Sequence, residues 1–184
     1  MEVMAGKPSE GITTKDRDPA REAELDTQEQ RSTPGDEVLR GKFGTQDIAA
    51  ATRIAENVAR FLESQDYFFI ATSNRQGECD SSYRGRGKGV PLIKILDEKT
   101  IIFPHYMGNG TFRSLGNILE NPHIGMLFMD FKTGLRLRVN GDAEISDDPD
   151  WLAMFPGSVE TVKVTVQEVY KQNRPARLPN PAGA

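Results

Sequence analysis

Residues 135–145 place the strongest constraint on the fold of this 184-residue chain. Along LRLRVNGDAEI, every second residue is apolar or small, from Leu135 through Val139 to Ile145, and the residues between them are polar or charged. Successive side chains of a strand point to opposite faces of its sheet, so this period of two predicts a strand with one buried and one solvated face. Such strands are typical of antiparallel sheets, because parallel sheets are usually covered on both faces.

Several other segments also have the composition of short strands. Residues 67–73 (YFFIATS) are rich in aromatic and β-branched residues and end at the turn-forming residues 74–77. Asp97, Glu98 and Lys99 separate two apolar runs and predict a tight hairpin. The expected strands are residues 67–73, 78–84, 90–96, 100–103, 123–129 and 135–145, with a last strand that carries Val162, Val164 and Val166.

Two segments have the period of amphipathic helices. The first helix is expected to begin at a cap supplied by Thr45 or Asp47, and the second covers residues 111–120 and ends before Pro122. The apolar stripe consists of Ile48, Ala51, Ala55, Val58 and Leu62 in the first helix, and of Phe112, Leu115 and Leu119 in the second. The order α-ββββ-α-βββ, with hairpin connections, predicts a mainly β fold: an antiparallel β-barrel with flanking helices.

The ends of the chain differ from this central part. Apolar residues make up only 37% of the sequence, and no aromatic residue precedes Phe43. A segment so polar cannot bury enough apolar surface to offset its ordering entropy. We therefore predict a disordered or partner-wrapping extension over residues 1–44, in which residues 20–28 and 36–40 could become helical against another surface. The globular domain is expected over residues 45–170, with an extended tail over residues 171–184.

Charge and composition exclude several classes of function. The formal net charge is −4, so nothing in the overall charge favours nucleic acid or an anionic membrane, and any anion must bind at a local cluster of cations. No apolar run is long enough to span a bilayer, and the N-terminus lacks the apolar core of a signal peptide. The single cysteine, Cys79, cannot form an intramolecular disulfide. The sequence thus predicts a cytoplasmic protein without nucleic acid or membrane partners.

The sequence also lacks the motifs of the common catalytic sites. Its two histidines, His105 and His123, do not stand at metal-ligand spacing from Cys79, and we interpret them as a surface and a strand residue respectively. No nucleophile elbow, P-loop or dinucleotide-binding glycine turn is present. Any chemistry is therefore expected to come from a cofactor.

Residues 82–89 (SYRGRGKG) form the first candidate binding segment. Arg84, Arg86 and Lys88 alternate with glycines between two expected strands. Arginine and lysine can neutralise a phosphate through charge-assisted hydrogen bonds, and glycine lets the backbone approach a ligand closely. The alternative interpretation, which this segment alone favours, is a flexible basic loop in solvent.

The second candidate is the turn at residues 108–110, which opens the helix that carries Arg113 and Ser114. A helix N-terminus offers unpaired N–H groups and about half a positive charge, so it can hold a phosphate. The alternative is an ordinary capped helix. The third candidate is the pair Arg136 and Arg138 on the polar face of residues 135–145, where arginines that only solubilise the sheet are the simpler interpretation.

In their order along the chain, these segments resemble the pyridoxamine 5'-phosphate oxidase-like family of FMN-binding split barrels. The resemblance covers residues 66–145, and its most specific part is residues 108–131, where a GN turn, a helical serine, an ENP stop and an apolar strand occur together. The matching segments read QDYFFIATS, CDSSYRGRGKGVPLIKILDEKTIIFP, GNGTFRSLGNILENPHIGMLFMDF and LRLRVNGDAEI.

The resemblance implies a split, six-stranded Greek-key barrel that forms a homodimer, with each FMN in a groove between the subunits. It places one group of residues near the flavin and another around the phosphate or ribityl chain. The first group is Arg84, Lys88, Val90 and Pro91, and the second is Asn109, Arg113 and Ser114.

The sequence departs from true pyridoxamine phosphate oxidases near its C-terminus. These enzymes carry an arginine-histidine substrate motif there, whereas this chain reads KQNRPARLPN. We therefore expect an FMN-dependent oxidoreductase that acts on another small molecule. Some split barrels bind deazaflavin or haem, or no cofactor, so the alternative is a non-catalytic module that binds a flavin or haem for storage or sensing.

Overall fold

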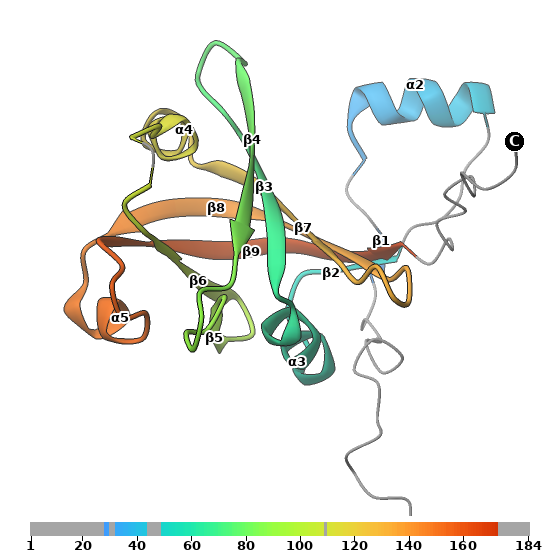
Figure 1. Cartoon of the computed structure of the whole chain (residues 1–184). Helices are drawn as coiled ribbons and strands as arrows, with labels where there is room; N and C mark the ends of the chain where they lie inside the picture. Colours follow the sequence, from blue (N-terminus) through green and yellow to red (C-terminus); the bar gives the residue numbers. More distant parts are fainter. Residues whose placement is uncertain (1–27, 30–31, 44–48, 109, 173–184) are drawn as a thin grey trace, which may run out of the picture.

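The computed structural model describes residues 28–29, 32–43, 49–108 and 110–172. Within these residues, the strands form one antiparallel sheet that curls around a core, with short helices at its ends (Figure 1). The helices are α2 (Pro34–Phe43), α3 (Glu56–Ser64), α4 (Arg113–Glu120) and α5 (Pro149–Ala153). The strands are β1 (Gln28–Glu29), β2 (Ala49–Ala51), β3 (Tyr67–Ser73), β4 (Cys79–Gly85), β5 (Lys94–Asp97), β6 (Thr100–His105), β7 (His123–Met129), β8 (Arg136–Ser146) and β9 (Glu160–Gln172).

The last strand, β9, holds the sheet together. It pairs antiparallel with β8 along nearly its whole length, with β6 through Glu160 to Thr165, and with β2 through Val169 and Tyr170. On the far side of β8 the order continues through β7 and β3 to β4, while β5 pairs with β6. The expected mainly β, antiparallel fold is therefore confirmed, with α5 as an additional short helix before the last strand.

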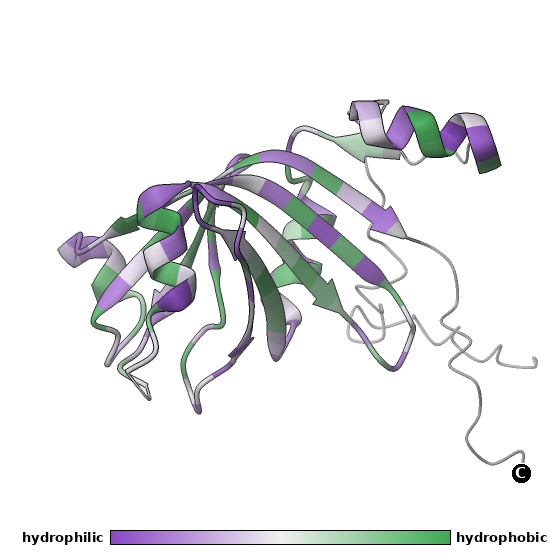
Figure 2. Cartoon of the chain, turned by 90° about the horizontal axis from the view of Figure 1, so that it is seen from above, coloured by the Kyte–Doolittle hydropathy of each residue, from purple (hydrophilic) through white to green (hydrophobic). Residues whose placement is uncertain are grey.

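Strand alternation builds the core as the sequence predicts. Along β8 the inward residues from Leu137 to Ala143 are buried, and the outward residues are exposed or half-buried, so purple and green alternate along the long strands in Figure 2. The core also receives Val58, Phe61 and Leu62 from α3. The most completely buried large side chains include Phe61, Phe68, Phe103, Phe128, Leu137 and Met126.

A glycine allows β8 and β9 to approach closely at a β-bulge. Asn140 pairs with Glu168 and Gly141 pairs with Val166, so Gln167 is an extra residue in β9. A Cβ atom on Gly141 would fall inside contact distance of the Thr165 carbonyl oxygen. The bulge thus requires glycine at this position.

The first predicted helix begins later than the sequence suggests. Residues 49–51 form β2 instead, with Ala50 opposite Tyr170 of β9, and residues 44–48 lie outside the described residues. Ala50 and Ala51 are buried in this edge pairing, which competes successfully with their helical propensity. The Ile54 N–H then donates to the Glu98 carbonyl at 2.7 Å, and the helix starts only at Glu56.

Near the N-terminus, the helix considered around residues 36–40 is present as α2. Thr33 and Asp36 cap it reciprocally: the Thr33 N–H donates to Asp36 at 3.0 Å, and the Asp36 N–H donates to the Thr33 hydroxyl at 3.2 Å. No residue of α2 is buried. Residues 20–27 and the tail after Gln172 lie outside the described residues.

Candidate functional site

The candidate site begins on β4, the strand at one edge of the sheet. Its residues Asp80, Ser82 and Arg84 alternate along one face, the face on which β3 carries its buried residues. The paired residues are Phe68 with Arg84, Ile70 with Ser82, and Thr72 with Asp80. Strand β4 therefore extends the inner face of the barrel with a polar stripe rather than an apolar one.

Arg84 lies in this stripe, and one of its guanidinium donors has no hydrogen-bond partner in the described part of the chain. Its guanidinium lies 5.9 Å from the centroid of the Phe103 ring, a cation–π contact. Its Nε atom is buried and has no hydrogen-bond partner among the residues that the structure describes. Burial lowers the pKa of Arg84, and the nearby Asp80 carboxylate opposes this shift. A buried cation with an unpaired donor can be stabilised by an anion.

His105, the last residue of β6, lies beside Arg84. It is 7% exposed, and neither ring nitrogen has a hydrogen-bond partner within the described part of the chain. Burial and then the Arg84 charge lower its pKa, which favours the neutral imidazole. The interpretation of His105 as a surface residue was wrong, because β6 extends two residues further than predicted and turns this side chain inward.

Helix α4 packs against β3, β4 and β8 next to these residues. The Phe112 ring lies 5.7 Å from the His105 ring, and the Gly116 N–H donates to the Phe112 carbonyl at 2.7 Å to close the first turn. Phe112 supplies no side-chain cap, so the first N–H groups of the helix have no side-chain acceptor from that residue. The Ser114 hydroxyl donates to the Asp80 carboxylate at 2.5 Å, and this bond fastens α4 to β4.

The buried face of α4 differs from the predicted stripe. Leu115 is buried as expected, but Phe112 and Leu119 are exposed by 48% and 75%. Ser114 and Asn117 are buried instead, because they bond to the neighbouring strands, Asn117 to the Thr72 hydroxyl at 3.2 Å. The helix is therefore rotated so that polar side chains face the polar edge of the sheet.

These contacts bring two of the predicted segments together. Ser114 is hydrogen-bonded to Asp80, which shares the inner face of β4 with Arg84. The Arg84 charge also acts on His105, which contacts Phe112 at the start of α4. Arg113 is exposed on the first turn of α4, and Asn109 lies outside the described residues.

The other predicted residues lie beyond the end of β4. Lys88 is exposed, and Val90 and Pro91 are half-buried. Within the described residues, no hydrogen bond or ion pair joins Lys88 to Arg84 or to α4. Their assignment to the site therefore remains a prediction.

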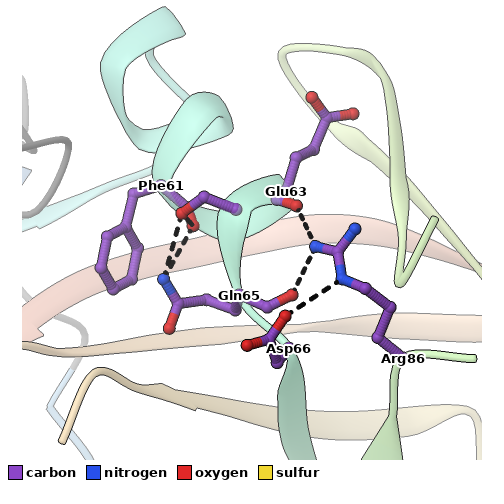
Figure 3. A network of polar contacts seen from close by, with 6 residues as sticks. Phe61, Glu63, Gln65, Asp66 and Arg86 are labelled. Atoms are coloured by element: carbon purple, nitrogen blue, oxygen red, sulfur yellow. Dashed lines mark hydrogen bonds and ion pairs between the residues drawn. The ribbon is translucent and has the colours of Figure 1, made fainter. Parts of the chain in front are cut away.

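Arg86, the middle cation of residues 82–89, makes structural contacts with the end of α3 and, among the described residues, none with the candidate site. Its guanidinium donates to the carbonyls of Glu63 and Gln65, each at 2.6 Å, and lies 3.4 Å from the Asp66 carboxylate (Figure 3). The Arg86 N–H also donates to the Asp66 carbonyl at 2.7 Å. These carbonyls lie at the C-terminal end of α3, where the helix dipole favours a positive charge.

The outward face of the sheet carries an aromatic cluster. The Tyr67 ring contacts Phe69, Tyr83 and Phe131 with centroids 5.7–6.1 Å apart, and Tyr83 and Phe131 are each 60% exposed. Farther along this face, Arg138 stacks on Tyr170 at 5.6 Å. Arg136 and Arg138 point outward, on the face opposite to Leu137, so they do not face the candidate site.

Sequence reasoning missed two members of the site, Asp80 and His105. The alternation of Asp80, Ser82 and Arg84 is a signal that could have placed Asp80 beside Arg84. For His105, the signal is its place two residues after Phe103, because alternation along β6 then puts it on the inner face. Within the described residues, no group of three or more histidine, cysteine or acidic residues could hold a metal ion, and no helix is long and apolar enough to cross a membrane.

Comparison with solved structures shows which folds this one resembles. HupZ from Group A Streptococcus is 20% identical, with a TM-score of 0.51 over 64% of this chain and 93% of its own. A proposed pyridoxamine 5'-phosphate oxidase from Lactobacillus delbrueckii is 18% identical, with a TM-score of 0.53 over 65% of this chain and 94% of its own. At these identities the likeness concerns the fold alone.

The sequence profile of a protein family gives the stronger match. No curated protein matches the chain. The profile described as pyridoxamine 5'-phosphate oxidase matches residues 54–176, which include α3, β3 to β9 and the whole candidate site. The chain therefore belongs to the pyridoxamine 5'-phosphate oxidase-like family of FMN-binding split barrels.

Proposed function

We propose that this protein binds FMN and works as an oxidoreductase on a small-molecule substrate, as a homodimer whose second copy completes the flavin site. The observation that carries the proposal is the cluster formed by Arg84 and His105. Three nitrogens in this cluster are buried and lack partners in the described part of the chain, and they lie beside the start of α4. Buried polar groups are nearly always paired in native proteins, so this cluster is suited to a polar ligand.

The residues present fit a phosphorylated flavin. Arg84 would hold the phosphate or another electron-rich group through a charge-assisted hydrogen bond, and the first turn of α4 adds partial positive charge. Arg113 and Ser114 stand on that turn and would take part. The neutral His105 imidazole offers one donor and one acceptor, which suits the hydroxyls of a ribityl chain or the polar edge of a ring.

Bound FMN supplies the hydride and electron transfer that the side chains of this protein do not provide. The chain itself would bind and orient the cofactor and keep water away from its polar edge. Lys88, Val90, Pro91 and Asn109 remain proposed contacts of the flavin. We assign no general acid or base. The C-terminal segment lacks the arginine-histidine motif, so vitamin B6 synthesis is not the proposed reaction.

The outward aromatic cluster supports the homodimer. Tyr83 and Phe131 expose large aromatic side chains beside Tyr67, on a face that is exposed to solvent in the monomer. Contiguous exposed apolar patches mark interaction surfaces. Covering this face with a second copy would bury the cluster without changing the core.

The test combines the absorption spectrum of the purified protein with titration by FMN and riboflavin. The wild-type protein is expected to carry flavin or to bind added FMN. Arg84→Gln should weaken FMN binding about ten- to hundredfold, because a hydrogen bond to a charged group contributes about 1.5–3 kcal/mol. Arg60→Gln, which removes a cation from a surface ion pair on α3, is the control and should bind like wild type. A protein that lacks flavin and does not respond to FMN would contradict the proposal.

One observation favours a second candidate, a non-catalytic binding module. A buried neutral histidine is also a suitable ligand for haem iron, and His105 has both nitrogens unpaired within the described residues. The same spectrum separates the two, because haem and flavin absorb differently. A protein whose bound flavin is not reduced by NADH, NADPH or another donor would also favour the module.

A further inference from the structure

Asp80 is the feature of the candidate site that a phosphate-binding site does not require. It stands on the inner face of β4, half-buried, opposite Thr72. Its carboxylate accepts the Ser114 hydroxyl at 2.5 Å, within the range of charge-assisted hydrogen bonds. It also acts electrostatically on Arg84. The carboxylate thus holds the Ser114 hydroxyl and shares the inner face of β4 with the Arg84 guanidinium, the two groups proposed to receive the phosphate.

We infer that Asp80 is a specificity-determining residue that limits the affinity of this site for phosphate, so that the flavin is held loosely and can exchange. This inference rests on the proposed function. A serine hydroxyl has a single proton, and while that proton is donated to Asp80 it cannot be donated to a phosphate oxygen. The Ser114 oxygen can then offer only lone pairs to the ligand.

The balance of charge at the site leads to the same conclusion. Arg84 contributes one positive charge and Asp80 one negative charge on the same face of β4, while His105 is favoured in its neutral form. The first turn of α4 adds only about half a positive charge, and Arg113 is exposed to solvent, where its interactions are weakened. A phosphate dianion entering this site meets a nearly neutral surface with a carboxylate in it. A ligand without the phosphate avoids that repulsion.

Alternatively, Asp80 would orient Ser114 and Arg84 so that both form hydrogen bonds with the phosphate. The two roles predict opposite effects of the same substitution. Asp80→Asn removes the charge and keeps the shape, and Asp80→Ala frees the Ser114 hydroxyl completely. Asp147→Asn is the matched control, because it removes the same charge from an exposed aspartate at the end of β8. Thermal unfolding of each variant verifies that it is folded.

The measurement is the dissociation constant of FMN and of riboflavin for each protein. We expect Asp80→Asn and Asp80→Ala to bind FMN at least about tenfold more tightly than wild type, a gain of about 1.4 kcal/mol. Their affinity for riboflavin should equal that of wild type. Asp147→Asn should change neither value. FMN affinity that is unchanged or weaker in both Asp80 variants overturns the inference, and so does an equal gain for riboflavin.

A second probe separates this inference from the proposed function. Inorganic phosphate can be titrated into the wild-type protein and the Asp80 variants while the amide resonances of Ser114 and Gly116 are followed by NMR. If no protein binds flavin, the proposed function fails, but tighter phosphate binding by the Asp80 variants still supports the role of Asp80. Phosphate binding that is the same in wild type and variants overturns that role, whether or not flavin binds.

Discussion

His105 and Phe112 lie ring against ring, with centroids 5.7 Å apart and planes tilted by 57°. The contact joins the last residue of β6 to the residue that precedes α4, across the loop between them. It holds the imidazole away from water while its nitrogens lack partners among the described residues. His105 is therefore a group whose protonation is expected to affect stability.

Stability should depend on the protonation of His105. Its folded pKa is lowered from 6.5, first by burial and then by the Arg84 charge, so folding favours the neutral ring. The stability that this ring contributes is complete above pH 6.5, and it is lost as the pH falls from 6.5 towards the folded pKa. His105→Gln should therefore lose less unfolding free energy between about pH 7.5 and pH 5 than wild type, as measured by urea denaturation. An equal loss in both proteins would contradict this prediction.

Arg86 should matter for stability and not for binding. Arg86→Met removes two hydrogen bonds to the carbonyls of Glu63 and Gln65 and leaves those acceptors poorly satisfied. We expect a loss of about 1–3 kcal/mol in unfolding free energy, measured by urea denaturation. Flavin affinity should stay within a factor of about two. Lys88→Met is the control for stability, because Lys88 is exposed, and it should leave the unfolding free energy unchanged.

Two glycines should respond to alanine in opposite directions. Gly141→Ala brings a methyl group against the Thr165 carbonyl at the bulge, and we expect a loss of about 3 kcal/mol as β8 and β9 are forced apart. Gly116→Ala, in α4, meets no atom within 4 Å and should raise stability by about 0.5–1 kcal/mol. Thermal unfolding of the two variants beside wild type measures both effects. A Gly141→Ala protein as stable as wild type would show that the strands tolerate the methyl group.

The aromatic cluster should control the oligomeric state. Replacing Tyr83 and Phe131 together with glutamate puts charge on the proposed interface, and we expect the dimer dissociation constant to rise at least about a hundredfold. Sedimentation velocity measures this shift, and flavin binding should weaken with it if the second copy completes the site. Leu96→Glu, on the β5–β6 hairpin, should remain dimeric. A double variant that stays dimeric would place the interface elsewhere.

The sequence was most informative where local pattern and tertiary environment agree. Residues 67–73 and 123–129 form strands with the predicted bounds. The first is rich in aromatic and β-branched residues and the second is almost wholly apolar, and both compositions suit a sheet that buries at least one face. The inward residues of β8 are also those that its alternation predicts. Ala50 and Ala51 show the opposite case, since their helical propensity is overridden by pairing with β9.

The candidate site was only partly predictable. Arg84 and Ser114 were proposed because glycines and a helix start are local signals, and their cofactor-binding role stays a prediction. Their partner Asp80 lies 34 residues from Ser114, and only the folded chain brings the two into contact. The burial of His105 likewise involves the Phe112 ring, which lies beyond the loop that follows β6. In the basic segment, Arg86 resembles Arg84 in sequence, but its place beside the carbonyls of α3 gives it a structural role.

The pairing of β9 with β2, β6 and β8 has a consequence for synthesis on the ribosome. Strands β2, β6 and β8 all pair with β9, and β9 is the last of the described elements to be synthesised. While that strand is still inside the exit tunnel, its partners present open edges to other nascent chains. We expect the barrel to close only after residues 160–172 have left the tunnel, which makes the newly made protein dependent on chaperones during that interval.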